Sequence, residues 1–189
     1  MPSGACKQGG AGIYRSGSDM GLIDRLFGRS GAGAASAPLY TAIVARGRAP
    51  DWYLAGGVAD TIDGRFDMIA AILSFVLLRM EEEPAAAMPS VELTERFIED
   101  MDSQLREEGV GDVGIGKRVG HMVSMLGGRL GAYRAGLAEG DLSTALRRNL
   151  YRGGSPDPAQ LDHVAGRLMD FRRALAATPV AALLAGDLP

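Results

Sequence analysis

The chain has almost none of the residues that bind transition metals or form disulfides. Cys6 is its only cysteine, and its two histidines, His121 and His163, lie far apart in the sequence. One thiol cannot form an internal disulfide, and no His or Cys spacing fits a structural zinc site. No Ser/His/Asp or Cys/His set is arranged for nucleophilic catalysis. We therefore expect no metal, no cofactor and no enzymatic activity, in a protein of a reducing compartment.

The chain also lacks a membrane-spanning segment and a strong charge of either sign. Its longest apolar run, Ile69–Leu78, is interrupted by Ser74 and has about half the length of a helix that crosses a bilayer. The formal net charge of −3 gives no general attraction to nucleic acid, so we do not expect DNA as a partner. Hydrophobic residues make up 47% of the 189 residues, which is enough to bury the core of one domain.

Glycine is abundant, and one glycine-rich segment is similar to a phosphate-binding loop. Gly109-x-Gly111-x-x-Gly114 fits the dinucleotide fingerprint, and Gly111 to Lys117 fits most of a Walker A loop. Both motifs need a strand before the glycines and a helix after them. The preceding residues 92–108 instead have a helical pattern, and Arg118 stands where a Walker A loop has Ser or Thr. We interpret the segment as a hinge between two helices, and a phosphate- or nucleotide-binding protein is the less favoured alternative.

The beginning of the chain predicts a flexible leader. Residues 1–37 are rich in glycine, serine and alanine, and they lack the apolar core of a signal peptide. Residues 20–28 within this leader predict a short basic amphipathic segment, and we expect Met20 to be the natural start. Such a segment either contacts a membrane surface or packs on the protein's own core. The residues that we expect to contact the membrane are Leu22, Ile23, Leu26 and Phe27.

The rest of the chain predicts helices and no strand. Apolar residues recur at intervals of three and four, and no segment alternates regularly between apolar and polar residues. We expect an all-α, single-domain bundle of about six helices over residues 38–178, then a C-terminal tail at 179–189 that begins with a short helix. The expected helices cover residues 38–48, 61–80, 90–108, 113–138, 141–150 and 158–177.

Two of these helices have features that predict their packing. The helix at 61–80 should be the most buried, because its apolar residues form a stripe from Ile62 through Phe66 to Met80. Glycines interrupt the middle of the helix at 113–138, and each costs up to about 1 kcal/mol relative to alanine. We expect another helix to pack closely on these glycines, which are Gly120, Gly127, Gly128 and Gly131.

Local signals predict the helix ends. Asp60 or Thr61, Ser90 and Asp141 have the residue types of N-caps, and Asp157 with Pro158 is a strong helix start. Residues 51–59, after Pro50, are expected to form a loop.

Four blocks of the sequence resemble the ubiquinol–cytochrome c chaperone family. The first is Leu-Arg-Glu-x-Gly-Val-Gly-Asp, followed by Gly-Lys-Arg, at residues 105–118. The second runs from Tyr40 and Arg48-x-Pro50 to the sequence DTIDGRFDMI at residues 60–69. The third is Asp100-Met-Asp102, and the fourth is Gly-Arg-Leu at 128–130 with Tyr133. The blocks follow the family's order and together cover residues 39–150.

The resemblance implies a function that the composition alone does not give. It implies a non-enzymatic chaperone for the assembly of ubiquinol–cytochrome c reductase, the respiratory complex III. The implied client is newly synthesised cytochrome b, with the ribosome and a small co-chaperone as further partners. No Arg-rich mitochondrial leader is evident, so we expect a bacterial protein in the cytoplasm, peripheral on the cytoplasmic face of the inner membrane. A peripheral membrane adaptor without a dedicated client is the alternative.

The same blocks and the charge pattern supply the candidate partner-binding residues. Arg65 does not suit the positive end of a helix, so we expect it to pair with Asp100 or Asp102 of the helix at 90–108. A strip formed by residues 118, 122, 125 and 129 could receive an apolar segment with an acidic edge, or could lie beside the core. The candidates are Asp60, Asp63, Arg65, Asp100, Asp102, Arg106, Asp112, Lys117, Arg118, Met122 and Arg129.

Overall fold

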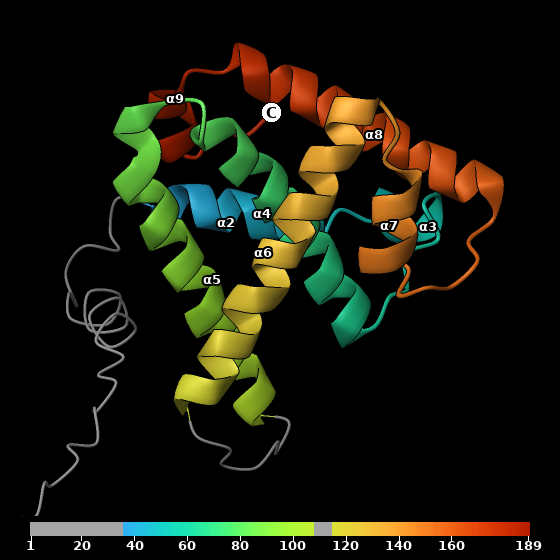
Figure 1. The fold of residues 1–189 in the computed structure, drawn as a ribbon, viewed down its shortest axis with the longest axis horizontal. Helices are drawn as coiled ribbons and strands as arrows, with labels where there is room; N and C mark the ends of the chain where they lie inside the picture. Colours follow the sequence, from blue (N-terminus) through green and yellow to red (C-terminus); the bar gives the residue numbers. More distant parts are fainter. Residues whose placement is uncertain (1–35, 108–114) are drawn as a thin grey trace, which may run out of the picture. The chain divides into compact units, whose positions relative to one another are not determined.

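The computed structural model describes residues 36–107 and 115–189, and it describes side chains for residues 36–103 and 119–189. This part of the chain is built from α-helices and turns, without a strand, which confirms the all-α prediction (Figure 1). Most of the expected leader, with its four membrane-contact residues, and most of the expected hinge lie outside the described residues. The helices are α2 (Ala37–Gly47), α3 (Asp51–Leu54), α4 (Ile62–Met80), α5 (Ala87–Glu107), α6 (Ile115–Glu139), α7 (Ser143–Asn149), α8 (Pro158–Ala177) and α9 (Val180–Leu184), with a 3₁₀ turn at Pro84–Ala86.

Helix α4 is the centre of the bundle, as predicted. Every residue from Asp67 to Leu78 is buried, because α2, α5, α6 and α8 all pack on this helix. The predicted stripe is wrong at its first position, since the side chain of Ile62 is 60% exposed. The first turn of α4 lies at the edge of the bundle, where no other helix covers Ile62, and the buried part begins one turn later. None of the described helices is both long enough and apolar enough to span a bilayer.

Most helix ends follow the predicted signals. The Thr61 hydroxyl accepts a hydrogen bond from the Gly64 N–H at 3.2 Å, and the Asp141 carboxylate accepts one from the Ser143 N–H at 2.8 Å. Asp157 forms a capping box with Gln160. Each of these bonds satisfies a donor of the first turn that the helix itself leaves without a partner.

Two local predictions are wrong. Ser90 is not an N-cap, because α5 begins at Ala87 and the Ser90 hydroxyl donates to the Ala86 carbonyl at 2.8 Å. Pro89 is tolerated in that first turn, where a backbone N–H has no intrahelical acceptor. Residues 51–54 form the short helix α3 and not a loop. Trp52 and Tyr53 fix α3 on the end of α2, because their side chains donate to the Arg46 and Gly47 carbonyls, each at 2.7 Å.

The prediction that another helix packs closely on Gly120, Gly127, Gly128 and Gly131 of α6 is also wrong. A Cβ added at any of them would meet nothing within 4 Å. Helix α6 packs through its opposite face, where Met122, Leu126 and Tyr133 are buried against the core. A glycine within a helix is compatible with a close neighbour or with open solvent, and the sequence pattern does not distinguish the two cases.

Burial of the tyrosine rings predicts a loss of stability at alkaline pH. Desolvation by burial is the main cause that raises the pKa of Tyr40, Tyr53, Tyr133 and Tyr151, and the pKa of Tyr151 rises from 10.0 to about 12. Above pH 10 these phenols ionise in the unfolded chain but stay protonated in the folded one. Because the unfolded state then binds fewer protons, stability falls as pH rises. The contribution is complete below pH 10 and is lost as pH rises toward about 12 for Tyr151.

Urea unfolding at several pH values, together with phenolate absorbance, tests this expectation. We expect the midpoint to decrease steadily above pH 10, and we expect a shallower decrease in Tyr151→Phe, which has one late-titrating phenol fewer. Described tyrosines that titrate close to pH 10.0 in the folded protein would contradict the prediction.

Candidate functional site

A buried carboxylate joins the start of α4 to α6 and to the loop between α7 and α8. Asp67 is fully buried. Its Oδ1 accepts a hydrogen bond from Arg129 Nη2 at 2.5 Å, and its Oδ2 accepts one from Arg152 Nε at 2.6 Å. Arg152 Nη1 also donates to Asp63 at 2.9 Å. We call these four residues, Asp63, Asp67, Arg129 and Arg152, the Asp67 cluster.

The position of Asp67 in α4 explains why this cluster forms. Since α4 has no solvent-facing side from residue 67 to residue 78, an ionised side chain there needs a charged partner. Arg129 supplies it, and its guanidinium also lies 5.4 Å from the centre of the Phe66 ring. Arg152 adopts a left-handed backbone with φ of 52°, which is uncommon for a residue with a side chain. Its hydrogen bond to Asp67 raises the pKa of the guanidinium, so it stays charged.

The cluster borders a hollow at the surface. Its volume is about 430 Å³, and Asp63, Asp67 and Arg152 line one part of it. Thr61 and Gln160 add polar groups. Both carboxylates of the hollow already bind Arg152, so their charge is largely neutralised.

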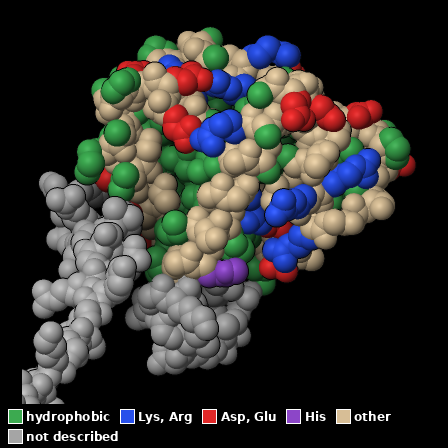
Figure 2. All heavy atoms as spheres, viewed as in Figure 1, with side chains coloured by type: hydrophobic (Ala, Val, Ile, Leu, Met, Phe, Trp, Pro, Cys, Tyr) green, Lys and Arg blue, Asp and Glu red, His purple; other side chains and the backbone are tan. Residues whose placement is uncertain are grey.

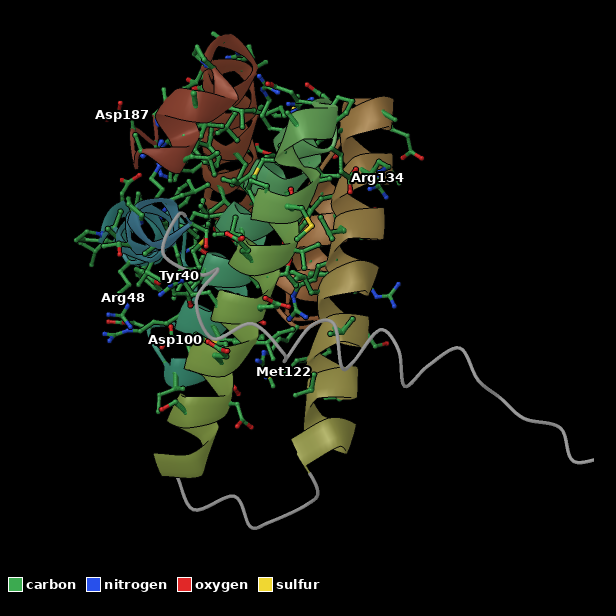
Figure 3. All side chains as sticks on the ribbon, turned by 90° about the vertical axis from the view of Figure 1, so that its left-hand side faces the viewer. Tyr40, Arg48, Asp100, Met122, Arg134 and Asp187 are labelled. Carbon is green, nitrogen blue, oxygen red and sulfur yellow. The ribbon has the colours of Figure 1, made fainter. Side chains whose placement is uncertain are left out.

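A second polar contact joins α2 to α5. The Tyr40 hydroxyl donates to Asp100 Oδ2 at 2.6 Å, and burial together with this carboxylate raises the pKa of the phenol. Figure 3 shows Tyr40 and Asp100 on facing helices, with Arg48 near the end of α2 on the same side. These residues line a hollow of about 510 Å³ that also includes Arg96 and Glu99.

The structure thus brings the separate sequence blocks together in pairs. The block at residues 60–69 meets the block at 128–130 through Asp67 and Arg129, and Tyr40 meets the block at 100–102 through Asp100. The two contacts hold α6 on α4 and α5 on α2. They fix the two long helices that lead into and out of the segment 108–114.

The predicted pairing of Arg65 with α5 is wrong. Arg65 Nε lies 2.7 Å from Asp60 Oδ1, and both side chains are more than half exposed. Arg65 therefore points outward from the first turn of α4, and its hydrogen bond lowers the pKa of Asp60. The residues that link α4 to α5 are instead Phe66 and Phe97, whose ring centres lie 5.6 Å apart.

The other candidate residues divide by exposure. Asp60, Asp63 and Arg65 lie together in the exposed first turn of α4 and before it, whereas Asp102 is partly buried. The described members of the strip on α6, at residues 122, 125 and 129, lie beside the core, which was the second of the two alternatives for it. Met122 is buried on the side that faces α5 (Figure 3), Met125 is partly buried, and Arg129 belongs to the Asp67 cluster. The side chains of four candidates lie outside the described ones: Arg106, Asp112, Lys117 and Arg118.

Sequence reasoning missed several residues that the structure places prominently. Asp67 carried a usable signal, because a single acid stood just before the apolar run of the most buried helix. Arg147 and Arg148, exposed at the end of α7, carried only the weak signal of two adjacent cations. Arg152 had no signal that separates it from an ordinary loop residue. Among the described residues, no three His, Cys, Asp or Glu side chains are placed to hold a metal ion.

Comparisons with known proteins identify one matching family and one similar solved structure. Residues 54–188 match the protein-family profile described as ubiquinol-cytochrome C chaperone. A solved structure, described as the crystal structure of the Cbp3 homolog from Brucella abortus, has 33% sequence identity and a TM-score of 0.73. The similarity covers 89% of this chain and 94% of that chain. No curated protein sequence matches the chain. The profile match includes α4 to α9 and therefore the whole Asp67 cluster.

Proposed function

The chain belongs to the ubiquinol–cytochrome c chaperone family, and we propose that it binds newly synthesised cytochrome b and shields it during assembly of respiratory complex III. The observation that carries the proposal is the family match over α4 to α9, which contains the contact between Asp67 and Arg129 that holds α6 on α4. Members of a chaperone family act by binding and release, and the Asp67 cluster contains ion pairs without a nucleophile.

We propose that the client binds around the exposed first turn of α4 and the ends of α5 and α6. Figure 1 shows that α5 and α6 extend beyond the other helices toward residues 108–114. Asp60, Asp63 and Arg65 are exposed charged side chains at α4, each held in an ion pair within the protein. Arg106, Asp112, Lys117 and Arg118 belong to the same proposal by their sequence positions, while Met122 and Arg129 support it from inside by holding α6. Charged residues at the edge of an interface contribute more to partner specificity and to the association rate than to affinity.

We further propose that the protein works at the cytoplasmic face of a bacterial inner membrane, where cytochrome b is inserted. The ribosome and a small co-chaperone are proposed partners at that place. The residues for membrane contact remain Leu22, Ile23, Leu26 and Phe27. The alternative, an adaptor without a dedicated client, predicts that deleting residues 20–28 abolishes flotation with liposomes and that no client is captured.

Capture from membranes of the source cell tests the proposed client. We expect the tagged full-length chain, after crosslinking, to enrich cytochrome b, and we expect the triple variant Arg106→Ala, Lys117→Ala and Arg118→Ala to lose this enrichment. Arg173→Ala is the control, because Arg173 is an exposed arginine of α8 on a different part of the chain. If the wild-type chain does not enrich cytochrome b, the proposed client is wrong.

A further inference from the structure

Helix α6 has a face that the described helices leave uncovered. The helix packs on α4, α5 and α7. On the remaining face, a Cβ at Gly127, Gly128 or Gly131 would meet nothing within 4 Å, and the side chain of Val123 is 43% exposed. Figure 2 shows this face as a strip of mostly bare backbone. A partner helix could approach the α6 axis closely there, because no side chains separate the two backbones.

Two of the charges near this face are not neutralised by the protein itself. Several exposed arginines elsewhere have carboxylate partners, as Arg65 has Asp60 and Arg173 has Asp170, whereas the exposed Arg48 forms no ion pair among the described residues. Within the part of the chain that the structure describes, Arg147 and Arg148 form no ion pair. They lie exposed in the last turn of α7. Figure 2 shows basic side chains gathered in the region of α7, beside the bare strip of α6.

The dipole of α7 explains only one of the two arginines at its C-terminal end. Cations at a helix C-terminus interact favourably with the helix dipole, so one arginine at the end of α7 needs no partner. Two adjacent arginines repel each other, and Arg152, itself half exposed, adds a third positive side chain nearby in the sequence. Arg152 is already bound to Asp63 and Asp67, whereas Arg147 and Arg148 keep their full charge for a partner outside the chain.

We propose that the uncovered face of α6 and the two arginines of α7 form one docking surface for a helix of the client that carries carboxylates along one edge. The open glycines receive the backbone of that helix, and Arg147 and Arg148 bind its carboxylates, for which the guanidinium fork is well suited. Arg134, an exposed arginine of α6, is already paired with Glu81 at 2.7 Å. Arg147 and Arg148 are therefore the cations left to bind the acidic edge of the client. This inference rests on the proposed function only for the identity of the client.

A protein helix fits this surface better than a lipid surface does. Membrane binding through an interfacial helix needs several exposed apolar side chains. On the described part of this face Val123 is the large hydrophobic residue that is exposed, and bare glycine backbone adds little hydrocarbon. Close contact between two helices instead gains from missing side chains.

A bulky side chain introduced on the open face of α6 should block docking without destabilising the fold. Gly128→Gln should fill the open face without touching the protein's own atoms, and it should leave the melting temperature equal or higher, because Gln is the better helix former. We expect this variant, in the full-length chain, to capture newly synthesised cytochrome b about tenfold less well, the order expected when a central interface position is lost. Gly166→Gln on α8 is the matched control, because Gly166 is likewise a helical glycine with nothing within 4 Å.

A charge reversal tests the second half of the surface. Arg148→Glu should weaken capture to a similar extent, whereas Arg173→Glu, which changes the net charge equally, should not. Equal capture by Gly128→Gln and Gly166→Gln would overturn the docking surface and leave the proposed function intact. If wild type captures no cytochrome b, the proposed function fails, and the client assigned to this surface fails with it. If Arg148→Glu lowers flotation with anionic lipid vesicles but not capture, the surface contacts lipid and the docking proposal is wrong.

Discussion

Replacing Asp67 with Asn is expected to lower the free energy of unfolding by about 3–5 kcal/mol, which is the range for removing one partner of a buried ion pair. The variant keeps the size of the side chain but removes its charge. Arg129 then stays in place with only 11% of its side chain exposed and without a counter-charge. Since small domains are stable by about 5–15 kcal/mol, a loss of this size leaves much of the chain unfolded near physiological temperature.

Equilibrium unfolding in urea measures this effect, and two comparison variants identify its cause. Asp60→Asn removes a carboxylate from the exposed pair with Arg65 and is expected to change stability little, because exposed ion pairs are screened by solvent. The double variant Asp67→Leu and Arg129→Met replaces the buried pair with apolar side chains and should recover much of the loss. Similar destabilisation by Asp60→Asn and Asp67→Asn would show that burial of the ion pair does not determine its contribution to stability.

The contrast between Asp67 and Arg65 shows where sequence reasoning about this chain succeeds and where it stops. Periodicity identified α4 as the most buried helix, because apolar residues were dense enough to cover every side of it. The choice of ion pair failed because the partners come from distant parts of the chain. Asp67 and Arg129 are separated by 62 positions, and no local pattern records that they meet. Asp60, which does bind Arg65, is only 5 positions away from it.

Most helix ends could be predicted from local sequence, whereas the exposed faces of helices could not. Thr61 and Asp157 could be predicted as caps, because a cap acts on backbone groups two or three residues away. Asp141 binds the Ser143 N–H as expected, but from the position before the N-cap Leu142. Ile62 was assigned to the core stripe by its spacing, but exposure at the end of a helix depends on how far its neighbours extend. For the strip that includes Met122, helical spacing left two alternatives open, a partner-binding surface or a position beside the core. The structure rotates it inward and leaves the glycine face of α6 outside.

The candidate site was accessible to sequence reasoning mainly through the family resemblance. The resemblance selected the blocks that contain Asp63, Asp100 and Arg129, and the structure explains two of these as contacts between helices. Physical reasoning from one sequence cannot separate residues that hold helices together from residues that bind a partner, because both are charged and both follow helical spacing. The lack of a carboxylate partner for Arg147 and Arg148 among the described residues became evident only from the structure, which shows such partners for Arg65, Arg134 and Arg173.

Two glycine-to-alanine substitutions should have opposite effects on stability. Gly64→Ala is expected to destabilise the protein by about 2–4 kcal/mol, because overpacking and a lost helix cap both contribute. The new Cβ would overlap the Ala59 carbonyl oxygen, which is backbone and cannot rotate away. Relief of the overlap would move the turn that holds the Thr61 cap. Gly128→Ala meets nothing within 4 Å and should instead stabilise the helix by up to about 1 kcal/mol.

Thermal and urea unfolding of the two variants, side by side, decide between two reasons for keeping a glycine. Neither residue has a positive φ, so backbone conformation does not require glycine at either position. If Gly64→Ala unfolds more easily than wild type, packing requires glycine at position 64. If Gly128→Ala unfolds less easily, the native Gly128 lowers the stability of the free protein. A Gly128→Ala protein that is more stable but captures its client less well would show that Gly128 is kept for docking. Destabilisation by both substitutions would contradict the open face of α6.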